Sequence, residues 1–438
     1  MIPLKPQGAR IMKDYGFYPA SCLFLLCYIF LISTTISCGN TTKADKVIAF
    51  DSSIILLPKA AYLSDGDKSK IYYDCDQWYN QYLKNSNFNG GVIVAKNGNI
   101  VFERYKGNAH LKGIDTINAN TSFHIASVSK TFTAMATLRL WQEGKLNIDE
   151  EVSRYLPEFN YPGVTIRCLL SHRSGLPNYI YFMEDLGWDK KVFIQNKDVL
   201  DWLINSKSEI KNIGLPCHNF TYCNTNYALL ALIIESVTRE PYAVYMKETF
   251  FAPLGMENTY VFTLADTNRI TPSYDWRGIE APLNYLDEVY GDKNIYSTPS
   301  DLLRWDRYLR SNVFYTPQTL EEAYKPYSNE KRGIRNYGLG WRMNIYPNGK
   351  KLIYHNGWWH GNNASFIRLQ EQNTTIIVLG NRYCTGIYKT KYLANLFDLE
   401  VEAGDEDSEG TGIDIRQVRD SNERVLPKPH SRRRHHRR

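Results

Sequence analysis

The sequence lacks several short motifs that would assign a function directly. Its 438 residues contain no Gly-x-Ser-x-Gly segment, which argues against the nucleophile elbow of an α/β-hydrolase. None of its eight cysteines forms a Cys-x-x-Cys pair, so neither a zinc site nor a thioredoxin-like site is indicated, and we expect no metal and no cofactor. Spacing cannot decide between free thiols and disulfides for the cysteines, which are Cys22, Cys27, Cys38, Cys75, Cys168, Cys217, Cys223 and Cys384.

The chain also lacks a strong excess of charge of one sign. It has 52 basic and 46 acidic residues, a formal net charge of +6. That balance is too even to suggest nucleic-acid binding, so we expect no nucleic-acid partner. The 43% of apolar and 22% of charged residues are ordinary for a globular protein, and the length suits one two-lobed domain or two domains.

No apolar run reaches the roughly 20 residues that a membrane-spanning helix requires. The longest, residues 22–32, has instead the proportions of the hydrophobic part of a signal peptide, with Met1 or Met12 as the start. It is followed by Thr-Ile-Ser-Cys-Gly around Cys38, which resembles a loose bacterial lipobox, in which the cysteine is lipidated. We predict a signal peptide at 1–37 and a lipid anchor on Cys38 that holds the protein on a membrane of the bacterial cell envelope. A plain signal anchor is the alternative.

The periodicity of the remaining chain predicts strands at both ends and helices between them. Strands at 91–95 and 100–105 flank Asn97-Gly98, a strong hairpin signal, and further strands are expected at 337–346, 351–356, 364–370 and 374–379. Consecutive strands joined by short turns imply an antiparallel sheet. With helices expected at 67–86 and 388–399, we predict an α/β (α+β) fold: an antiparallel sheet flanked by N- and C-terminal helices, with an inserted helical lobe.

Composition suggests the domain boundaries. Residues 38–66 mix polar residues with short apolar pieces, which predicts a partly docked tether, and 67–399 would form the globular domain. Within it, the aromatic segment 178–188 is interpreted as a loop and a candidate cleft wall. From 400 to 438 an acidic run precedes an arginine-rich end with little apolar surface, so we expect disorder there.

One stretch carries a candidate nucleophile. Ser127 stands three residues before Lys130 at the start of a predicted helix, whose apolar residues recur at helical spacing: Phe132, Met135, Leu138 and Trp141. Positions three apart share a helix face, so a desolvated Lys130 amine could take the proton of the Ser127 hydroxyl. Ser127 could equally be a helix N-cap, with Lys130 a solvated charge. The spacing alone decides nothing, because it recurs at Ser208 and Ser328.

Two later motifs accompany this pair. They are Tyr222-Cys223-Asn224, followed by an apolar helix, and His355-Asn356-Gly357. In the order Ser-x-x-Lys, Tyr-x-Asn, His-x-Gly they resemble the signature motifs of the serine β-lactamase and penicillin-binding protein family, in the branch that holds class C β-lactamases, D,D-carboxypeptidases and esterases. The segments 166–176, 253–256, 296–305 and 337–341 look like the same family. The resemblance covers residues 67–399 and implies the β-lactamase/transpeptidase-like fold.

The motifs depart from the family pattern in three ways. Cys223 stands where serine is usual, and His355 stands where β-lactamases usually carry lysine, which counts against an efficient β-lactamase. No Glu-x-x-Leu-Asn segment is present, so water activation at deacylation would fall to Tyr222 and Lys130. A serine–histidine pair of His172 and Ser174 is a weaker alternative, since it lacks the elbow motif.

By this resemblance, three residues carry the chemistry. Ser127 attacks a substrate carbonyl, while Lys130 and Tyr222 share the proton transfers, each useful only if its surroundings bring its pKa towards neutrality. The backbone N–H groups of Ser127 and Trp358 would form the oxyanion hole. Three further residues would bind substrate: Asn224, which can pair with an amide, His355, which offers a hydrogen bond or a positive charge, and Gly357.

These roles predict a monomeric serine hydrolase that acts through an acyl-enzyme. Its substrates would be D-amino-acid peptides, amides or esters in the envelope, either small molecules or peptides of peptidoglycan. A β-lactamase or carboxylesterase of the same fold is one alternative. An inactive protein that only binds cell-wall peptide is another, against which the retention of all three motifs argues, although fold and triad alone cannot set the leaving group.

Overall fold

The computed structural model describes residues 55, 57–211, 213–330 and 332–401, all within one compact unit, 52–438. The predicted signal peptide, the lipidation site Cys38 and the tail beyond residue 401 lie outside the described residues. Among the described helices, none combines the length and the apolar character that a membrane span requires.

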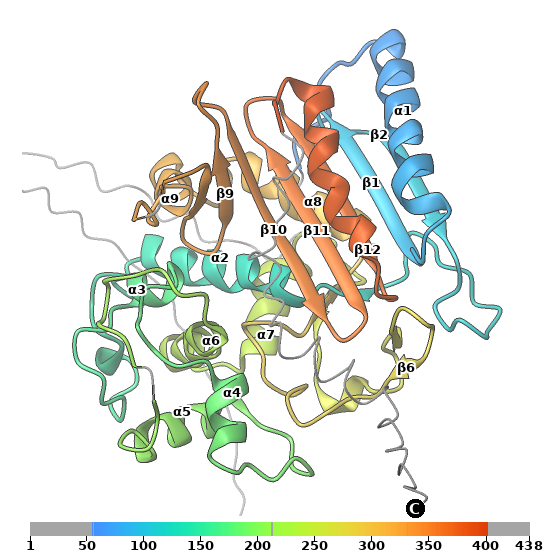
Figure 1. Ribbon diagram of the computed structural model, residues 1–438. Coiled ribbons are helices and arrows are strands. Elements are labelled where there is room, and N and C mark those ends of the chain that lie inside the picture. Colours follow the sequence, from blue (N-terminus) through green and yellow to red (C-terminus); the bar gives the residue numbers. More distant parts are fainter. Residues whose placement is uncertain (1–54, 56, 212, 331, 402–438) are drawn as a thin grey trace, which may run out of the picture. The chain divides into compact units, whose positions relative to one another are not determined.

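A seven-stranded antiparallel sheet organises the fold (Figure 1). Its strand order is β2-β1-β12-β11-β10-β9-β8, so strands from the two ends of the chain pair, as Gly90 does with Gly380. This confirms the predicted antiparallel sheet, although the single strand expected at 337–346 is two strands joined by a turn. The strands are β1 (Gly90–Lys96), β2 (Asn99–Lys106), β8 (Arg335–Tyr337), β9 (Arg342–Ile345), β10 (Lys351–Trp359), β11 (Asn362–Leu369) and β12 (Thr374–Gly380).

The alternation of side chains gives the sheet two buried faces. On β12, Ile376 and Val378 belong to one apolar core, and Ile377 and Leu379 belong to the other. The first core is covered by α1 (Asp65–Tyr79), its π-helical extension (Asn80–Lys84) and the C-terminal helix η6 (Thr385–Phe397). Both terminal helices were predicted, but η6 begins earlier than expected and has 3₁₀ geometry.

The second face of the sheet packs against α8 (Pro299–Arg310) and the core that surrounds α2 (Ser129–Gln142). In Figure 1, α2 runs between the strands and the green helices of the inserted lobe. Most of its residues are buried, because it packs against α6 (Asn224–Thr238) and shares an apolar core with Ile377 and Leu379 of the sheet. The other described α-helices are α3 (Ile166–Leu170), α4 (Tyr179–Asp185), α5 (Asn196–Asn205), α6 (Asn224–Thr238), α7 (Tyr242–Met246), with a π-helical extension (Lys247–Phe251), and α9 (Pro317–Ala323).

Short strands complete the inserted lobe. One small sheet has the order β3-β7-β4 and the other pairs β5 with β6. The strands are β3 (Phe123–His124), β4 (Tyr260–Val261), β5 (Ser273–Tyr274), β6 (Glu280–Ala281) and β7 (Ile295–Ser297). Because β3 leads directly to the turn that carries Ser127, its pairing with β7 fixes the position of that turn relative to the lobe.

The aromatic segment that the sequence predicted as a loop is largely helical. Residues Tyr179–Asp185 form α4, whose N-cap is Asn178, with the Asn178 side chain accepting from the Ile180 N–H. The loop prediction was wrong because the segment is held by tertiary contacts: the Tyr179 hydroxyl donates to the Asp292 carboxylate at 3.0 Å. Tyr179 is fully buried, which also excludes it from a cleft surface.

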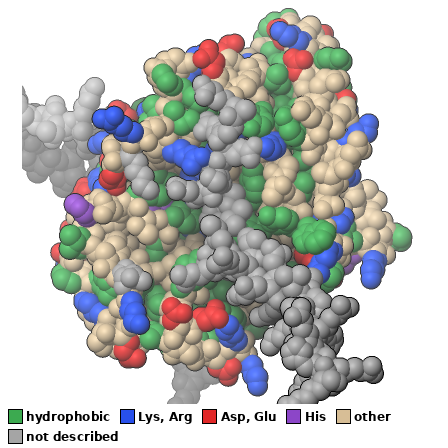
Figure 2. Space-filling model, in the orientation of Figure 1, with side chains coloured by type: hydrophobic (Ala, Val, Ile, Leu, Met, Phe, Trp, Pro, Cys, Tyr) green, Lys and Arg blue, Asp and Glu red, His purple; other side chains and the backbone are tan. Residues whose placement is uncertain are grey.

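Both ends of the described chain contact the domain. The Ile55 N–H donates to the Pro253 carbonyl oxygen at 2.8 Å, and the Ala61 N–H donates to that of Asn97 at 2.9 Å. At the other end Val401 is buried and exchanges two hydrogen bonds with the Asn395 side chain. On the face shown in Figure 2, basic and acidic side chains are interspersed.

Candidate active site

The turn before α2 exposes Ser127 between buried neighbours. Ser127 lies in the 3₁₀ turn Ala126–Val128 and is half-exposed, whereas Ala126 and Val128 are buried. Ala126 has a φ of +49°, a conformation that costs a residue with a side chain roughly 1–2 kcal/mol. The Ala126 N–H donates to His124 Nδ1 at 3.1 Å, which holds the turn. The N-cap of α2 is Val128, so Ser127 does not serve as a helix cap.

Lys130 is fully buried beside Ser127. Its Nζ donates to the Ser127 Oγ at 3.1 Å and to the Asp292 carbonyl oxygen at 2.8 Å. The same nitrogen lies 5.0 Å from the ring centroid of Tyr222 and 5.7 Å from that of Tyr227. The interpretation of Lys130 as a solvated first-turn charge is therefore wrong.

Two of the competing pairs named from sequence do not form a comparable site, while Lys331, which stands three residues after Ser328, lies outside the described residues. Ser208 and Lys211 are both exposed. The Ser174 hydroxyl donates to Asn226 Oδ1 at 2.6 Å and no hydrogen bond links it to His172 in the described chain. Of the described serine–lysine pairs at this spacing, the one at Ser127 alone combines a buried amine with an accessible hydroxyl.

The second motif places Tyr222 against the Lys130 amine. The Tyr222 hydroxyl oxygen is buried and has no hydrogen-bond partner among the described residues. Helix α6 begins at Asn224, which is half-exposed. Between them Cys223 is buried, its thiol donates to the Pro177 carbonyl oxygen at 3.5 Å, and burial raises its pKa. Cys223 is therefore a protonated structural thiol and not a competing nucleophile.

His355 is neutral in this site. Its pKa lies well below the ordinary value because the side chain is fully buried and because Arg342 and Lys130 lie nearby. Its Nδ1 contacts the Asn356 carbonyl oxygen at 2.7 Å, which can only accept, so Nδ1 carries the proton. Its Nε2 then accepts from the Tyr337 hydroxyl at 3.3 Å. The expectation that His355 supplies a positive charge is not supported.

Gly357 lets strand β10 approach the nucleophile. A Cβ at this position would lie 2.3 Å from the Ile125 carbonyl oxygen and 3.2 Å from the Ser127 nitrogen. Strand β9 pairs with β10 only as far as Tyr354, so beyond that residue β10 runs beside the Ser127 turn. Trp358 follows Gly357 on this stretch, which is where a second N–H could join that of Ser127.

Sequence reasoning missed two charged residues beside the motifs. Asp292 holds Lys130 through its carbonyl oxygen, and its buried carboxylate pairs with Lys293 at 3.6 Å. Arg342 places its guanidinium carbon 4.8 Å from the ring centroid of Tyr222. The available signal was closeness in sequence to segments that resemble the family: Arg342 directly follows 337–341, and Asp292 stands four residues before 296–305.

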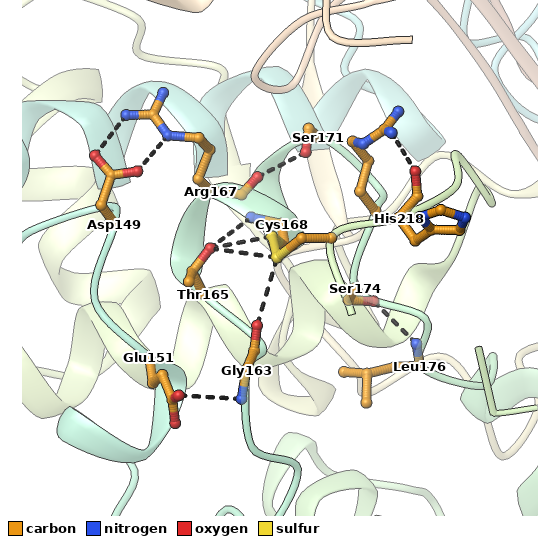
Figure 3. The surroundings of a disulfide bond; sticks show 12 residues. Asp149, Glu151, Gly163, Thr165, Arg167, Cys168, Ser171, Ser174, Leu176 and His218 are labelled. Carbon is orange, nitrogen blue, oxygen red and sulfur yellow. Dashed lines mark hydrogen bonds and ion pairs between the residues drawn. A yellow bond between two sulfur atoms is a disulfide. The ribbon is translucent and has the colours of Figure 1, made fainter. Parts of the chain in front are cut away.

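A disulfide joins the segment before Tyr222 to α3. Cys168 and Cys217 are bonded, with 5.3 Å between their Cα atoms, while Cys75, Cys223 and Cys384 are free and buried. Figure 3 shows the bond beside Thr165, the N-cap residue of α3. The sequence left the pairing open, because no local sequence pattern links two cysteines that are 49 residues apart.

A family model described as beta-lactamase matches residues 75–387, more than half of the chain. The chain belongs to the beta-lactamase family. Penicillin-binding protein 4* of Bacillus subtilis (strain 168) is 33% identical to this beta-lactamase-family chain over 316 residues, which cover 67% of the chain and 68% of that protein.

Two solved structures show the shared fold of the family. A penicillin binding protein from Bacillus halodurans has a TM-score of 0.63 at 23% identity and covers 76% of this chain and 99% of its own. A class C beta-lactamase has a TM-score of 0.63 at 21% identity, and the match covers 78% of this chain and 100% of that structure's chain. The chain is therefore a serine hydrolase of the β-lactamase and penicillin-binding protein family, with the β-lactamase/transpeptidase fold.

Proposed function

We propose that this protein hydrolyses its substrate through an acyl-enzyme on Ser127. The observation that carries the proposal is the double hydrogen bond of the buried Lys130 amine, to Ser127 Oγ and to the Asp292 carbonyl oxygen. In its amine form, Lys130 gives an N–H to Asp292 and keeps its lone pair for the Ser127 proton. Tyr222, against the same amine, passes the proton to the leaving group.

The oxyanion that forms on the substrate carbonyl would be bound by two backbone N–H groups. Ser127 supplies one, and Trp358, on the strand that Gly357 allows to approach, supplies the other. Asn224 at the start of α6 would orient the substrate amide, since its side chain offers both a donor and an acceptor.

The substrate class we propose is D-amino-acid peptides, or related amides and esters. The name of the Bacillus subtilis relative, a penicillin-binding protein, supports a peptide of the cell wall. A neutral His355 in place of a lysine supports a peptidase or esterase over an efficient β-lactamase. β-Lactam hydrolysis is the second candidate, favoured by the fold shared with a class C enzyme.

A covalent adduct with a fluorescent penicillin tests the nucleophile. Intact-mass measurement should show one adduct on the wild type and none on Ser127→Ala, and hydrolysis of an activated ester should be lost in the same variant. Ser208→Ala is the matched control and should behave as the wild type, because Ser208 is exposed and away from a buried amine. An adduct or turnover that persists in Ser127→Ala would falsify the assignment.

We further propose that the protein works in the bacterial envelope, anchored by lipid on Cys38. The Cys168–Cys217 disulfide supports an oxidising compartment, where such bonds persist. Expressed in a bacterium, Cys38→Ser should leave the membrane fraction or accumulate as an uncleaved precursor. An unmodified mature N-terminus at another residue would rule out the anchor.

A further inference from the structure

His172 is a buried histidine for which the proposed mechanism has no use. It directly follows the C-cap of α3, is fully buried, and has a φ of +56°, in the left-handed region. Its Nε2 has no hydrogen-bond partner among the described residues. A strained backbone and an unpaired polar atom both oppose stability, so their presence at one residue points to a functional reason.

The residues on either side of Tyr222 both donate their backbone N–H groups to this one residue. The Thr221 N–H donates to the His172 carbonyl oxygen at 2.8 Å, and the Cys223 N–H donates to His172 Nδ1 at 3.1 Å. The His172 ring also packs on the Tyr222 ring, with 4.3 Å between centroids. Backbone and side chain of Tyr222 are thus located by His172 together.

The ring nitrogen can accept only in one protonation state. An amide donor at Nδ1 requires that Nδ1 be unprotonated, so the proton of the neutral ring sits on Nε2. Burial lowers the pKa of His172 well below its ordinary value. The neighbouring Lys130, Arg342 and His355 lower it further. The neutral, accepting ring is therefore the form present at ordinary pH.

The chain that leads to Tyr222 is held against the same turn. The Cys217 N–H donates to the Arg173 carbonyl oxygen at 2.8 Å, and the Gly214 N–H donates to that of Gly175 at 2.7 Å. The disulfide from Cys217 to α3 closes this arrangement, whose α3 side is drawn in Figure 3. In this series of backbone hydrogen bonds between residues 172–175 and 214–221, His172 lies nearest to Tyr222.

We propose that His172 is a positioning residue for acyl transfer, which holds the Tyr222 phenol against the Lys130 amine by accepting the Cys223 N–H. The inference rests on the proposed function of Tyr222 and Lys130. His172 does not touch the substrate; it acts through Tyr222. Loss of its acceptor should therefore slow proton transfer and leave substrate binding in place.

The experiment compares one substitution, His172→Phe, in two backgrounds. His172→Phe keeps a ring but removes the acceptor, and should lower kcat for an activated ester by about 10- to 100-fold with little change in KM, as a small misplacement of a catalytic group does. In a Tyr222→Phe background the same substitution should change the rate by less than about twofold, because residues that act as one unit are not additive. Single-turnover acylation, monitored by intact-mass spectrometry, measures the rates that are too slow for steady-state assays. Leu203→Ala, a buried change in α5, controls for lost stability.

Each outcome decides the inference. An unchanged kcat in His172→Phe, or an equal loss in both backgrounds, overturns it, whereas absence of any adduct on the wild type refutes the proposed function instead. Should His172→Phe fail to fold, His172→Asn keeps an acceptor and tolerates the backbone, so it should retain more activity than His172→Ala. In addition, ¹⁵N spectra of labelled histidine should show an unprotonated His172 Nδ1 from pH 6 to 8. The opposite tautomer would contradict the proposal.

Discussion

The side-chain nitrogen of Lys130 lies 3.1 Å from the Oγ of Ser127, and its other hydrogen bond goes to the carbonyl oxygen of Asp292. The first contact joins neighbours on one helix turn, and the second joins residues 162 positions apart. Together the two contacts orient the buried amine towards the Ser127 hydroxyl. The expected behaviour of this amine and of Tyr222 follows from that orientation.

Lys130→Ala and Tyr222→Phe should each slow acylation by about 10²–10⁴-fold, the usual contribution of a positioned acid or base. The double variant should be little slower than the worse single one, since both residues serve one proton path. Stopped-flow or mass-resolved acylation by an activated ester measures the three rates. Losses that multiply in the double variant would show two independent paths.

His355→Lys should destabilise the protein and impair the ester reaction. The new ammonium would be buried next to Arg342 and Lys130, and like charges in a buried site oppose each other. Adding Arg342→Leu removes one cation and should recover stability and ester acylation. It should also shift preference towards substrates with a carboxylate, such as penicillins, over neutral esters. If His355→Lys alone unfolds at the wild-type urea midpoint, the charge argument is wrong.

Removing the disulfide with Cys168→Ser/Cys217→Ser should lower the free energy of unfolding by about 2–4 kcal/mol, because the bond restricts the unfolded chain. Reductant should lower the wild-type midpoint and leave that of the double variant unchanged. Cys384→Ser, which alters a free buried thiol, is the matched control and should not change the response to reductant. If reductant does not change the unfolding midpoint of the wild type, the disulfide does not form.

Stability should fall as the pH drops below about 6.5, the ordinary pKa of histidine. Burial lowers the pKa of His124 to about 4, partly offset by its hydrogen bond to Asn294. Between the two values the unfolded chain binds more protons than the folded one, so acid favours unfolding. The full shift corresponds to about 3 kcal/mol for this one residue, and the buried His172 and His355 act in the same direction.

Urea midpoints at pH 8, 6.5 and 5 check this dependence. His124→Asn should flatten it, whereas His218→Asn, at an exposed position, should leave the slope unchanged. A midpoint that stays constant from pH 8 to pH 5 would contradict the neutral state assigned to the buried histidines.

Local patterns in the sequence determined most of the fold. The hairpin at Asn97-Gly98 forms as predicted, because both residues adopt the positive φ, 53° and 78°, that such turns require. Ser127 and Lys130 meet because the 3₁₀ turn that carries Ser127 runs directly into α2, and positions three apart on such a helical stretch lie close together. The alternation on β12 likewise follows from the two-residue period of a strand.

Only the tertiary structure decided the electrostatics of the site. Asp292, Arg342 and His172 reach the motif residues from distant segments, and no spacing rule relates segments that are joined by long connections. His355 was expected to offer a hydrogen bond or a positive charge, and it is neutral, because protonation depends on burial and on the cations packed around the ring. The sequence thus determined which residues form the site, while packing determined which of them carry a charge there.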